Sequence, residues 1–138
     1  MGVRFYMETI KKVAFLYFND GKILSTRSHG KDKYYIPGGK KEIGESDIDT
    51  LIREVYEELS VKIIIPTVEL YGVFKAQAHG KSEGNFVEMI CYTAKYTGNL
   101  IAASEIDEIV WLSYSDINMV SPVDKLIFLD LQMKGLLK

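Results

Sequence analysis

Three glutamates crowd one short segment of this sequence. The segment REVYEEL, residues 53–59, places Glu54, Glu57 and Glu58 within about one and a half helical turns. On a helix, residues three and four apart share a face, so these carboxylates would form a ridge of like charge. A divalent cation that prefers oxygen ligands would relieve their repulsion. Taken alone, however, the ridge is more typical of a solvated helix face, because glutamate is a good helix former and acidic surface faces are common.

The residues around the ridge predict the helix that must carry it. From Ile48 onward, apolar residues recur with the three-and-four spacing of an amphipathic helix that ends near Leu59. Ser46 can cap this helix, and Asp49 at its third position makes an acidic variant of the capping box. The expected apolar stripe comprises Ile48, Leu51, Ile52, Val55 and Leu59. The stripe and the glutamates occupy different sectors, so the ridge does not compromise the core.

The segment upstream of the helix strengthens the case for a cation. Gly38 and Gly39 precede a loop that leads to Glu45, just outside the helix. Glycines allow backbone carbonyls to approach a ligand closely. Arg53 lies beside the ridge and could hold Glu45 or another carboxylate by a bidentate bond. Mg²⁺ usually keeps several waters, so a few carboxylates and one carbonyl suffice as protein ligands.

The remaining pattern predicts a single α/β domain over residues 1–138. We expect a hairpin of strands 10–18 and 22–28 around the turn Asn19 to Gly21, then a short strand at 34–36. Residues 61–78 and 85–98 are rich in strand formers, and 108–112 is a further short strand. A helical turn follows Ser113, and Pro122 opens a C-terminal helix over 121–137. This order favours a mixed β-sheet with helices packed on its faces.

Composition and charge exclude several classes of protein. The 138 residues carry 17 basic and 19 acidic side chains, a formal net charge of −2, so we expect no DNA or RNA polymer as partner. The apolar runs are too short to span a bilayer, and we expect no membrane contact. Cys91 is the single cysteine and lies in a strand-like run, which favours a buried structural thiol in a reducing cytoplasm.

From Gly39 the sequence reads GKKEIGESDIDTLIREVYEELSV, which resembles the Nudix box, G-x5-E-x7-R-E-U-x-E-E-x-G-U with U a bulky aliphatic residue. The one departure is Ser60, where the pattern has glycine. The matching positions are Gly39, Glu45, Arg53, Glu54, Val55, Glu57, Glu58 and Val61. The resemblance implies the family's α/β/α sandwich. Because a residue after a helix often adopts the left-handed conformation, Ser60 is expected to change local geometry at a cost of about 1 kcal/mol.

The resemblance also implies a chemistry. Nudix hydrolases use Mg²⁺ or Mn²⁺ to cleave the diphosphate of a nucleoside diphosphate linked to another moiety. By this resemblance Glu54, Glu57, Glu58 and the Gly38 carbonyl would ligate the metal, and Arg53 and Glu45 would orient the carboxylates. A glutamate outside the box often orients the attacking water. The candidates here are Glu105, which we favour, and Glu83 and Glu88.

Substrate contacts are less constrained by the sequence. Arg27 could face the phosphates or form a surface ion pair, and Gly38 and Gly39 would line the site. Four aromatic side chains, Tyr34, Tyr35, Phe74 and Phe86, could stack on a base, although strand aromatics more often belong to the core. Among them Phe74 is our choice. His79, in a polar loop, is expected to be exposed and not a ligand.

Three hypotheses follow for the function. The first is an enzyme that hydrolyses a nucleotide or nucleoside diphosphate derivative, in the manner of MutT-like members that convert nucleoside triphosphates to monophosphate and pyrophosphate; ADP-ribose and dinucleoside polyphosphates are further options. The second is a non-catalytic, nucleotide-sensing Nudix-like domain. The third is an interaction domain with a merely solvated acidic helix. Nudix proteins are often dimers, so the resemblance also makes a homodimer an option.

Overall fold

The computed structural model describes residues 8–78 and 85–138. Its two α-helices are α1, Asp47–Leu59, and α2, Pro122–Met133, and two short 3₁₀ helices span Ile65–Thr67 and Tyr114–Met119. The strands are β1 Glu8–Leu16, β2 Phe18–Asn19, β3 Lys22–Ser28, β4 Gly38–Lys40, β5 Lys62–Ile63, β6 Glu69–Gln77, β7 Asn85–Thr93, β8 Tyr96–Thr97 and β9 Ile106–Leu112.

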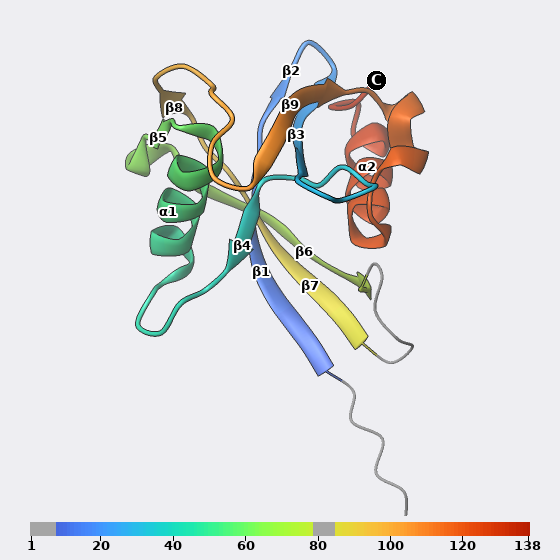
Figure 1. Ribbon diagram of the computed structural model, residues 1–138. Helices are drawn as coiled ribbons and strands as arrows, with labels where there is room; N and C mark the ends of the chain where they lie inside the picture. Colours follow the sequence, from blue (N-terminus) through green and yellow to red (C-terminus); the bar gives the residue numbers. More distant parts are fainter. Residues whose placement is uncertain (1–7, 79–84) are drawn as a thin grey trace, which may run out of the picture.

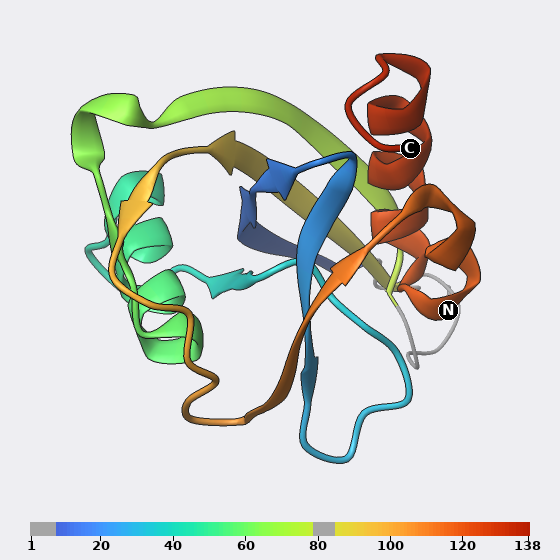
Figure 2. The ribbon, with the colours of Figure 1, turned by 90° about the horizontal axis from the view of Figure 1, so that it is seen from above.

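The two helices lie on opposite sides of the strands (Figures 1 and 2). The larger sheet has the order β4-β1-β7-β6, in which β1 and β7 run parallel and the other neighbours antiparallel. A second sheet has the order β2-β3-β9, and β5 pairs with β8. This arrangement confirms the expected α/β fold with a mixed sheet and a helix on each side.

Strand β1 separates two halves of the core. Val13 and Phe15 are buried in the cluster that includes α1, whereas Ala14 and Leu16 are buried in the cluster that includes α2. Successive side chains of a strand point to opposite faces, so one continuous apolar run serves both layers. The apolar run at residues 13–16, the second half of this strand, thus results from burial on both faces.

The expected hairpin of residues 10–18 and 22–28 was wrong in its first strand. β1 ends at Leu16 and lies in the larger sheet, and only Phe18–Asn19 pairs with β3. The chain changes sheets at Tyr17, whose carbonyl still accepts the Leu24 N–H at 2.9 Å. The turn itself was correctly placed, because Asp20 and Gly21 adopt φ values of 56° and 76° that suit a tight hairpin.

Two further boundaries differ from expectation. Of residues 34–36, only Tyr34 and Tyr35 make bridges, each an isolated one, and the short strand β4 begins instead at Gly38. A Cβ at Gly38 would collide with the Val13 carbonyl, so only glycine permits β4 to pair this closely with β1. The C-terminal helix ends at Met133 rather than near residue 137, and Gly135 follows with φ 75°.

Helix α1 begins as its sequence predicts. The Ser46 hydroxyl accepts the Asp49 N–H, and the Asp49 carboxylate accepts the Ser46 N–H, both at 3.1 Å. Leu51, Val55 and Leu59 are fully buried, but Ile48 is exposed, which corrects the expected stripe at its first position. In the described part of the chain, neither helix is long and apolar enough to cross a bilayer.

Candidate metal and catalytic site

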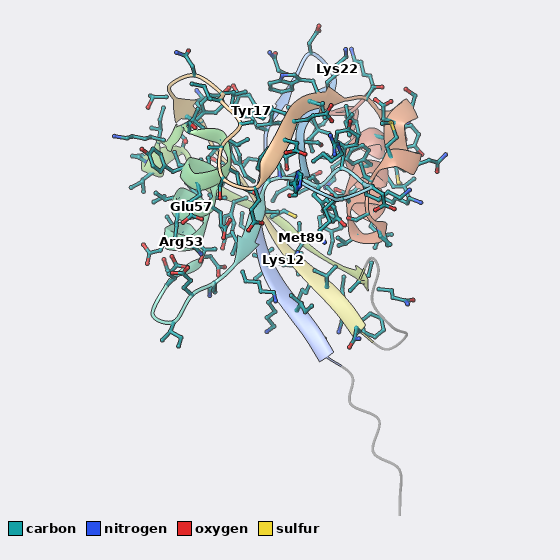
Figure 3. All side chains as sticks on the ribbon, in the orientation of Figure 1. Lys12, Tyr17, Lys22, Arg53, Glu57 and Met89 are labelled. Carbon is teal, nitrogen blue, oxygen red and sulfur yellow. The ribbon has the colours of Figure 1, made fainter. Side chains whose placement is uncertain are left out.

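Arg53 organises the acidic residues of α1 and the loop before it. Its guanidinium binds the Glu45 carboxylate bidentately, with Nε to Oε2 at 2.7 Å and Nη2 to Oε1 at 2.9 Å. This is the bond that the sequence suggested. Nη1 donates to Glu54 at 2.8 Å, and Nη2 also donates to the Lys40 carbonyl at 3.0 Å. Figure 3 labels Arg53 and Glu57 about one turn apart on α1.

The electrostatics of this cluster differ from residue to residue. The Arg53 guanidinium, helped by the Glu42 N–H, lowers the pKa of Glu45 to about 2, so Glu45 is a permanent anion. Burial raises the pKa of Glu54. Burial also raises the pKa of Glu58 to about 8, although the Gly38 N–H donates to its Oε1 at 2.9 Å. Burial therefore disfavours the charged forms of Glu54 and Glu58, and a nearby cation would favour them.

Gly39 makes room for one of these carboxylates. A Cβ at this position would lie 2.5 Å from the carboxyl carbon of Glu54. Because the rigid backbone of β4 cannot retreat, any side chain here would push Glu54 out of its place beside Arg53. Gly39 thus leaves space for Glu54 in the acidic site, whereas Gly38 allows β4 to pair with β1.

A cavity of about 280 Å³ opens where the carboxylates meet the loop before β9. Its described lining consists of Ser28, Gly38, Glu54, Glu57, Glu58, Ser104, Glu105 and Ile106. Glu105 is far from the helix glutamates in sequence, because it belongs to the loop before β9. Its backbone carbonyl accepts the His29 N–H at 2.8 Å, which ties the loop to the end of β3. Tertiary structure thus brings a fourth carboxylate to the ridge.

A second cavity, of about 240 Å³, adjoins the first and shares Ser28, Gly38 and Glu58 with it. The residues that line it include the apolar Ile10 and Met89 and the basic Lys12. Lys12 and Met89 are register partners on β1 and β7 and are labelled in Figure 3. The two cavities together offer a polar, acidic compartment beside a mostly apolar one.

The comparisons with known proteins agree with this geometry. The family model described as NUDIX domain matches residues 9–130. The chain belongs to the Nudix family. A Bacillus subtilis (strain 168) protein named as an uncharacterized Nudix hydrolase, YvcI, is 36% identical over 122 residues, which cover 84% of this chain and 74% of the relative.

Solved structures of other proteins share the fold. The solution structure of the E. coli ORF135 protein has a TM-score of 0.69 at 27% identity, over 91% of this chain and 92% of that one. The MutT protein from Methanosarcina mazei Go1 has a TM-score of 0.75 at 20% identity, over 96% and 99% of the two chains. The resemblance found in the Nudix box is therefore confirmed for the chain as a whole.

The oxygen-rich lining fits the divalent cation that Nudix hydrolases generally use. Carboxylates are the ligands that Mg²⁺ and Mn²⁺ prefer, and the strained Glu54 and Glu58 would gain most from a cation. Within residues 8–78 and 85–138, no three acidic, histidine or cysteine side chains already form a metal-ligand cluster. Waters and substrate oxygens would have to complete the coordination.

Several expected substrate contacts lie elsewhere in this Nudix domain. Arg27 is paired with Glu108 at 3.0 Å, and the Tyr34 hydroxyl donates to the same carboxylate at 2.7 Å. The structure therefore shows the ion-pair alternative for Arg27. Phe74 stacks on Tyr71 with ring centroids 6.5 Å apart and packs against the core. It is not among the described residues that line either cavity.

Some of the remaining aromatic and acidic candidates line a cavity, and others do not. Tyr35 lines the second cavity, whereas the Phe86 ring lies under the Lys75 ammonium, 5.3 Å from it. Glu88 pairs with Lys11 at 3.9 Å and is not among the described lining of the acidic cavity. Glu83 and His79 lie outside the described residues. Of the three acids considered outside the box, Glu105 alone is placed beside the ridge by the described structure.

Among the charged residues that line the second cavity, sequence reasoning missed Lys12 and Asp124. Asp124 is fully buried at the start of α2, and its Oδ2 accepts the Ile36 N–H at 2.9 Å. Its Oδ1 is buried without a hydrogen bond in the described structure, and burial raises its pKa to about 7. The only local signal in the sequence was the position of each charge: Lys12 directly precedes the apolar run of β1, and Asp124 lies near the start of the apolar helix α2.

Cys91 is buried, as expected, and burial raises the pKa of its thiol. A protonated thiol is a poor nucleophile. The described structure therefore supports a structural role for this residue.

Glu58 should make the stability of the metal-free protein depend on pH. Its folded pKa of about 8 exceeds the ordinary 4.5, so the stability it contributes is complete below pH 4.5 and is lost as the pH rises through 8. We expect Glu58→Gln to flatten this decline and to raise the free energy of unfolding at pH 9 by on the order of 3 kcal/mol. Urea denaturation with a chelator at pH 5, 7 and 9 measures it.

The exposed Glu42 provides the control for this experiment, because Glu42→Gln removes one carboxylate without removing a buried one. Burial also raises the folded pKa of Asp124 to about 7, so this residue adds its own loss of stability as the pH rises towards 7, and both variants retain that loss. Equal slopes in wild type and Glu58→Gln would contradict the assignment.

Proposed function

We propose that this Nudix domain is a divalent-metal-dependent nucleotide pyrophosphohydrolase. The observation that carries the proposal is the acidic cavity, which Glu54, Glu57 and Glu58 of α1 line together with Glu105 of a distant loop. A solvated helix face would need neither the glycine that seats Glu54 nor the arginine that clamps Glu45. We propose conversion of a nucleoside triphosphate to monophosphate and pyrophosphate as the first reaction to test.

The roles of the residues follow from their surroundings. Glu54, Glu57, Glu58 and the Gly38 carbonyl would hold Mg²⁺ or Mn²⁺, which when bound neutralises the pyrophosphate charge and makes water a better nucleophile. Glu105 lines the same cavity from the loop before β9. A carboxylate there, free of the Arg53 clamp, can orient a water and accept its proton.

The adjoining cavity would take the nucleoside or other linked moiety. Its apolar lining residues suit the face of a base, while Lys12 and Asp124, which also line it, can meet polar atoms of the ligand. Tyr35 is the aromatic residue placed to contribute. These three residues replace Phe74 and Arg27 as the substrate contacts that we propose.

The experiment is a substrate panel of nucleoside triphosphates, ADP-ribose and dinucleoside polyphosphates with Mg²⁺ or Mn²⁺, with products identified by mass spectrometry. We expect at least one substrate to be cleaved at a phosphoanhydride bond, and a chelator to stop the reaction. Metal-dependent nucleotide binding with no turnover of any panel member would contradict the proposal and favour a nucleotide-sensing domain.

Arg53→Lys should lower kcat by about 10- to 100-fold, because lysine cannot bind Glu45 bidentately and reach Glu54 and the Lys40 carbonyl together. The loss should appear in kcat and in Mg²⁺ affinity, measured by calorimetry. Lys41→Arg is the control, because it makes the reverse substitution in a neighbouring ion pair, in which Lys41 Nζ lies 2.7 Å from Asp47 Oδ1. It should leave kcat and Mg²⁺ affinity near wild type. Unchanged Mg²⁺ affinity in Arg53→Lys would show that the clamp does not orient the ligands.

A further inference from the structure

Helix α1 ends at Ser60 in a conformation that disfavours serine. Ser60 has φ 65° and ψ 19°, the left-handed region, and its N–H donates to the Tyr56 carbonyl at 3.0 Å. A residue with a Cβ is less stable there than glycine by about 1 kcal/mol. Serine has one property that glycine lacks at this position, a hydroxyl group.

That hydroxyl makes a specific long-range bond. Ser60 Oγ donates to the Ile101 carbonyl at 2.9 Å. Two backbone bonds flank it, from the Ile101 N–H to the Leu59 carbonyl at 2.9 Å and from the Ala103 N–H to the Glu58 carbonyl at 3.1 Å. The last carbonyls of a helix have no partner within the helix, and here the 100–105 segment supplies the partners. The three bonds dock this segment onto the end of α1.

The docked segment carries Glu105. Ser104, directly before it, also has a left-handed backbone with φ 57°, and the Ile106 N–H donates to the Ala103 carbonyl at 3.1 Å. The chain therefore turns sharply between the docked residues and Glu105. Because Glu58 contributes its carbonyl to the docking and its carboxylate to the acidic cavity, the docking point and the site belong to the same helical residue.

We propose that Ser60 is a positioning residue, whose hydroxyl bond to Ile101 sets Glu105 against the metal-binding carboxylates. The inference rests on the proposed role of Glu105 in the hydrolytic function. Loss of this bond leaves the two backbone bonds in place, so the segment stays near α1 but samples more positions. Chemistry then slows, while binding of metal and substrate, which Glu105 does not provide, persists.

The test is Ser60→Gly, which removes the hydroxyl and also relieves the left-handed strain. We expect kcat for a substrate from the panel to fall about fivefold, the equivalent of one hydrogen bond, with KM and Mg²⁺ affinity unchanged. The midpoint of thermal unfolding should stay the same or rise, and amide hydrogen exchange at Ile101 and Ala103 should accelerate. A purely structural role for Ser60 would lower stability and activity together.

A matched control is Asp20→Gly, which relieves the same kind of strain, φ 56°, in the distant β2–β3 turn. It should not slow turnover. Ser60→Ala separates the two effects of the main variant, because it keeps the strain and removes only the hydroxyl; its kcat should match that of Ser60→Gly. Unchanged kcat in Ser60→Gly, or unchanged exchange at Ile101 and Ala103, would overturn the proposal.

The double variant Ser60→Gly with Glu105→Gln tests the route of the effect. If Ser60 acts through Glu105, removal of its hydroxyl should cost nothing further once Glu105 is neutral. The same fivefold loss in both backgrounds would overturn the proposal. Full turnover in Glu105→Gln alone would instead refute the water-orienting role of Glu105, while hydrogen exchange would still report whether the hydroxyl docks the segment.

Discussion

Glu57→Gln should reduce kcat by about 10³-fold or more with Mg²⁺ while the protein remains folded. Glu57 lines the acidic cavity, yet its side chain is 51% exposed and its only described ion pair is a 3.4 Å contact with Arg53. Loss of its charge therefore costs the fold little. It removes one carboxylate from the set that would hold the cation, and electrostatic stabilisation of this kind contributes several powers of ten to a rate.

Turnover of the best panel substrate and Mg²⁺ titration by calorimetry measure this prediction, with thermal unfolding as a check on folding. Glu42→Gln is the matched control. Glu42 is also an exposed acid near Arg53, at 3.8 Å, but it is not among the described lining of the cavity. Equal turnover in wild type and Glu57→Gln would rule out the catalytic assignment of the ridge.

Glu105→Gln should lower kcat by about 10²-fold, with Mg²⁺ affinity close to wild type. Glu105 is exposed at the rim of the acidic cavity and belongs to no described ion pair, so the substitution removes a proton acceptor and leaves the α1 carboxylates intact. A general base contributes about 10²- to 10⁴-fold to a rate. The split between kcat and metal affinity distinguishes Glu105 from the residues of the ridge.

Glu88→Gln is the control for Glu105, because Glu88 was a rival candidate and pairs only with Lys11 among the described ion pairs. We expect it to retain full activity. A large loss of activity in Glu88→Gln and none in Glu105→Gln would reverse the assignment.

The clearest agreement between sequence and structure concerns local features of α1. Its capping box, its acidic ridge and the Arg53–Glu45 bond depend on residues within eight positions of each other. Helical geometry converts such spacings directly into distances. The left-handed conformation of Ser60 was foreseeable for the same reason, but the partner of its hydroxyl, Ile101, was not.

The disagreements concern pairings between distant segments. The sequence suggested one strand over residues 10–18, yet the chain changes sheets at Tyr17. Arg27 seemed available for phosphates until β9 placed Glu108 beside it. Phe74 was expected to face the substrate, and its ring instead stacks on Tyr71. Glu108 lies 81 residues from Arg27, and the position of the Phe74 ring depends on the core cluster against which it packs.

By itself, the sequence of this Nudix domain determined the α/β class, the helix with its acidic ridge, and the chemistry that such a ridge suits. These follow from short spacings, in which backbone geometry leaves few alternatives. Only the tertiary structure decided that Glu105 joins the ridge and that Lys12 and Asp124 line the adjoining cavity. The physical reason is strand register and loop docking: each depends on contacts summed over the whole fold, so no local pattern encodes them.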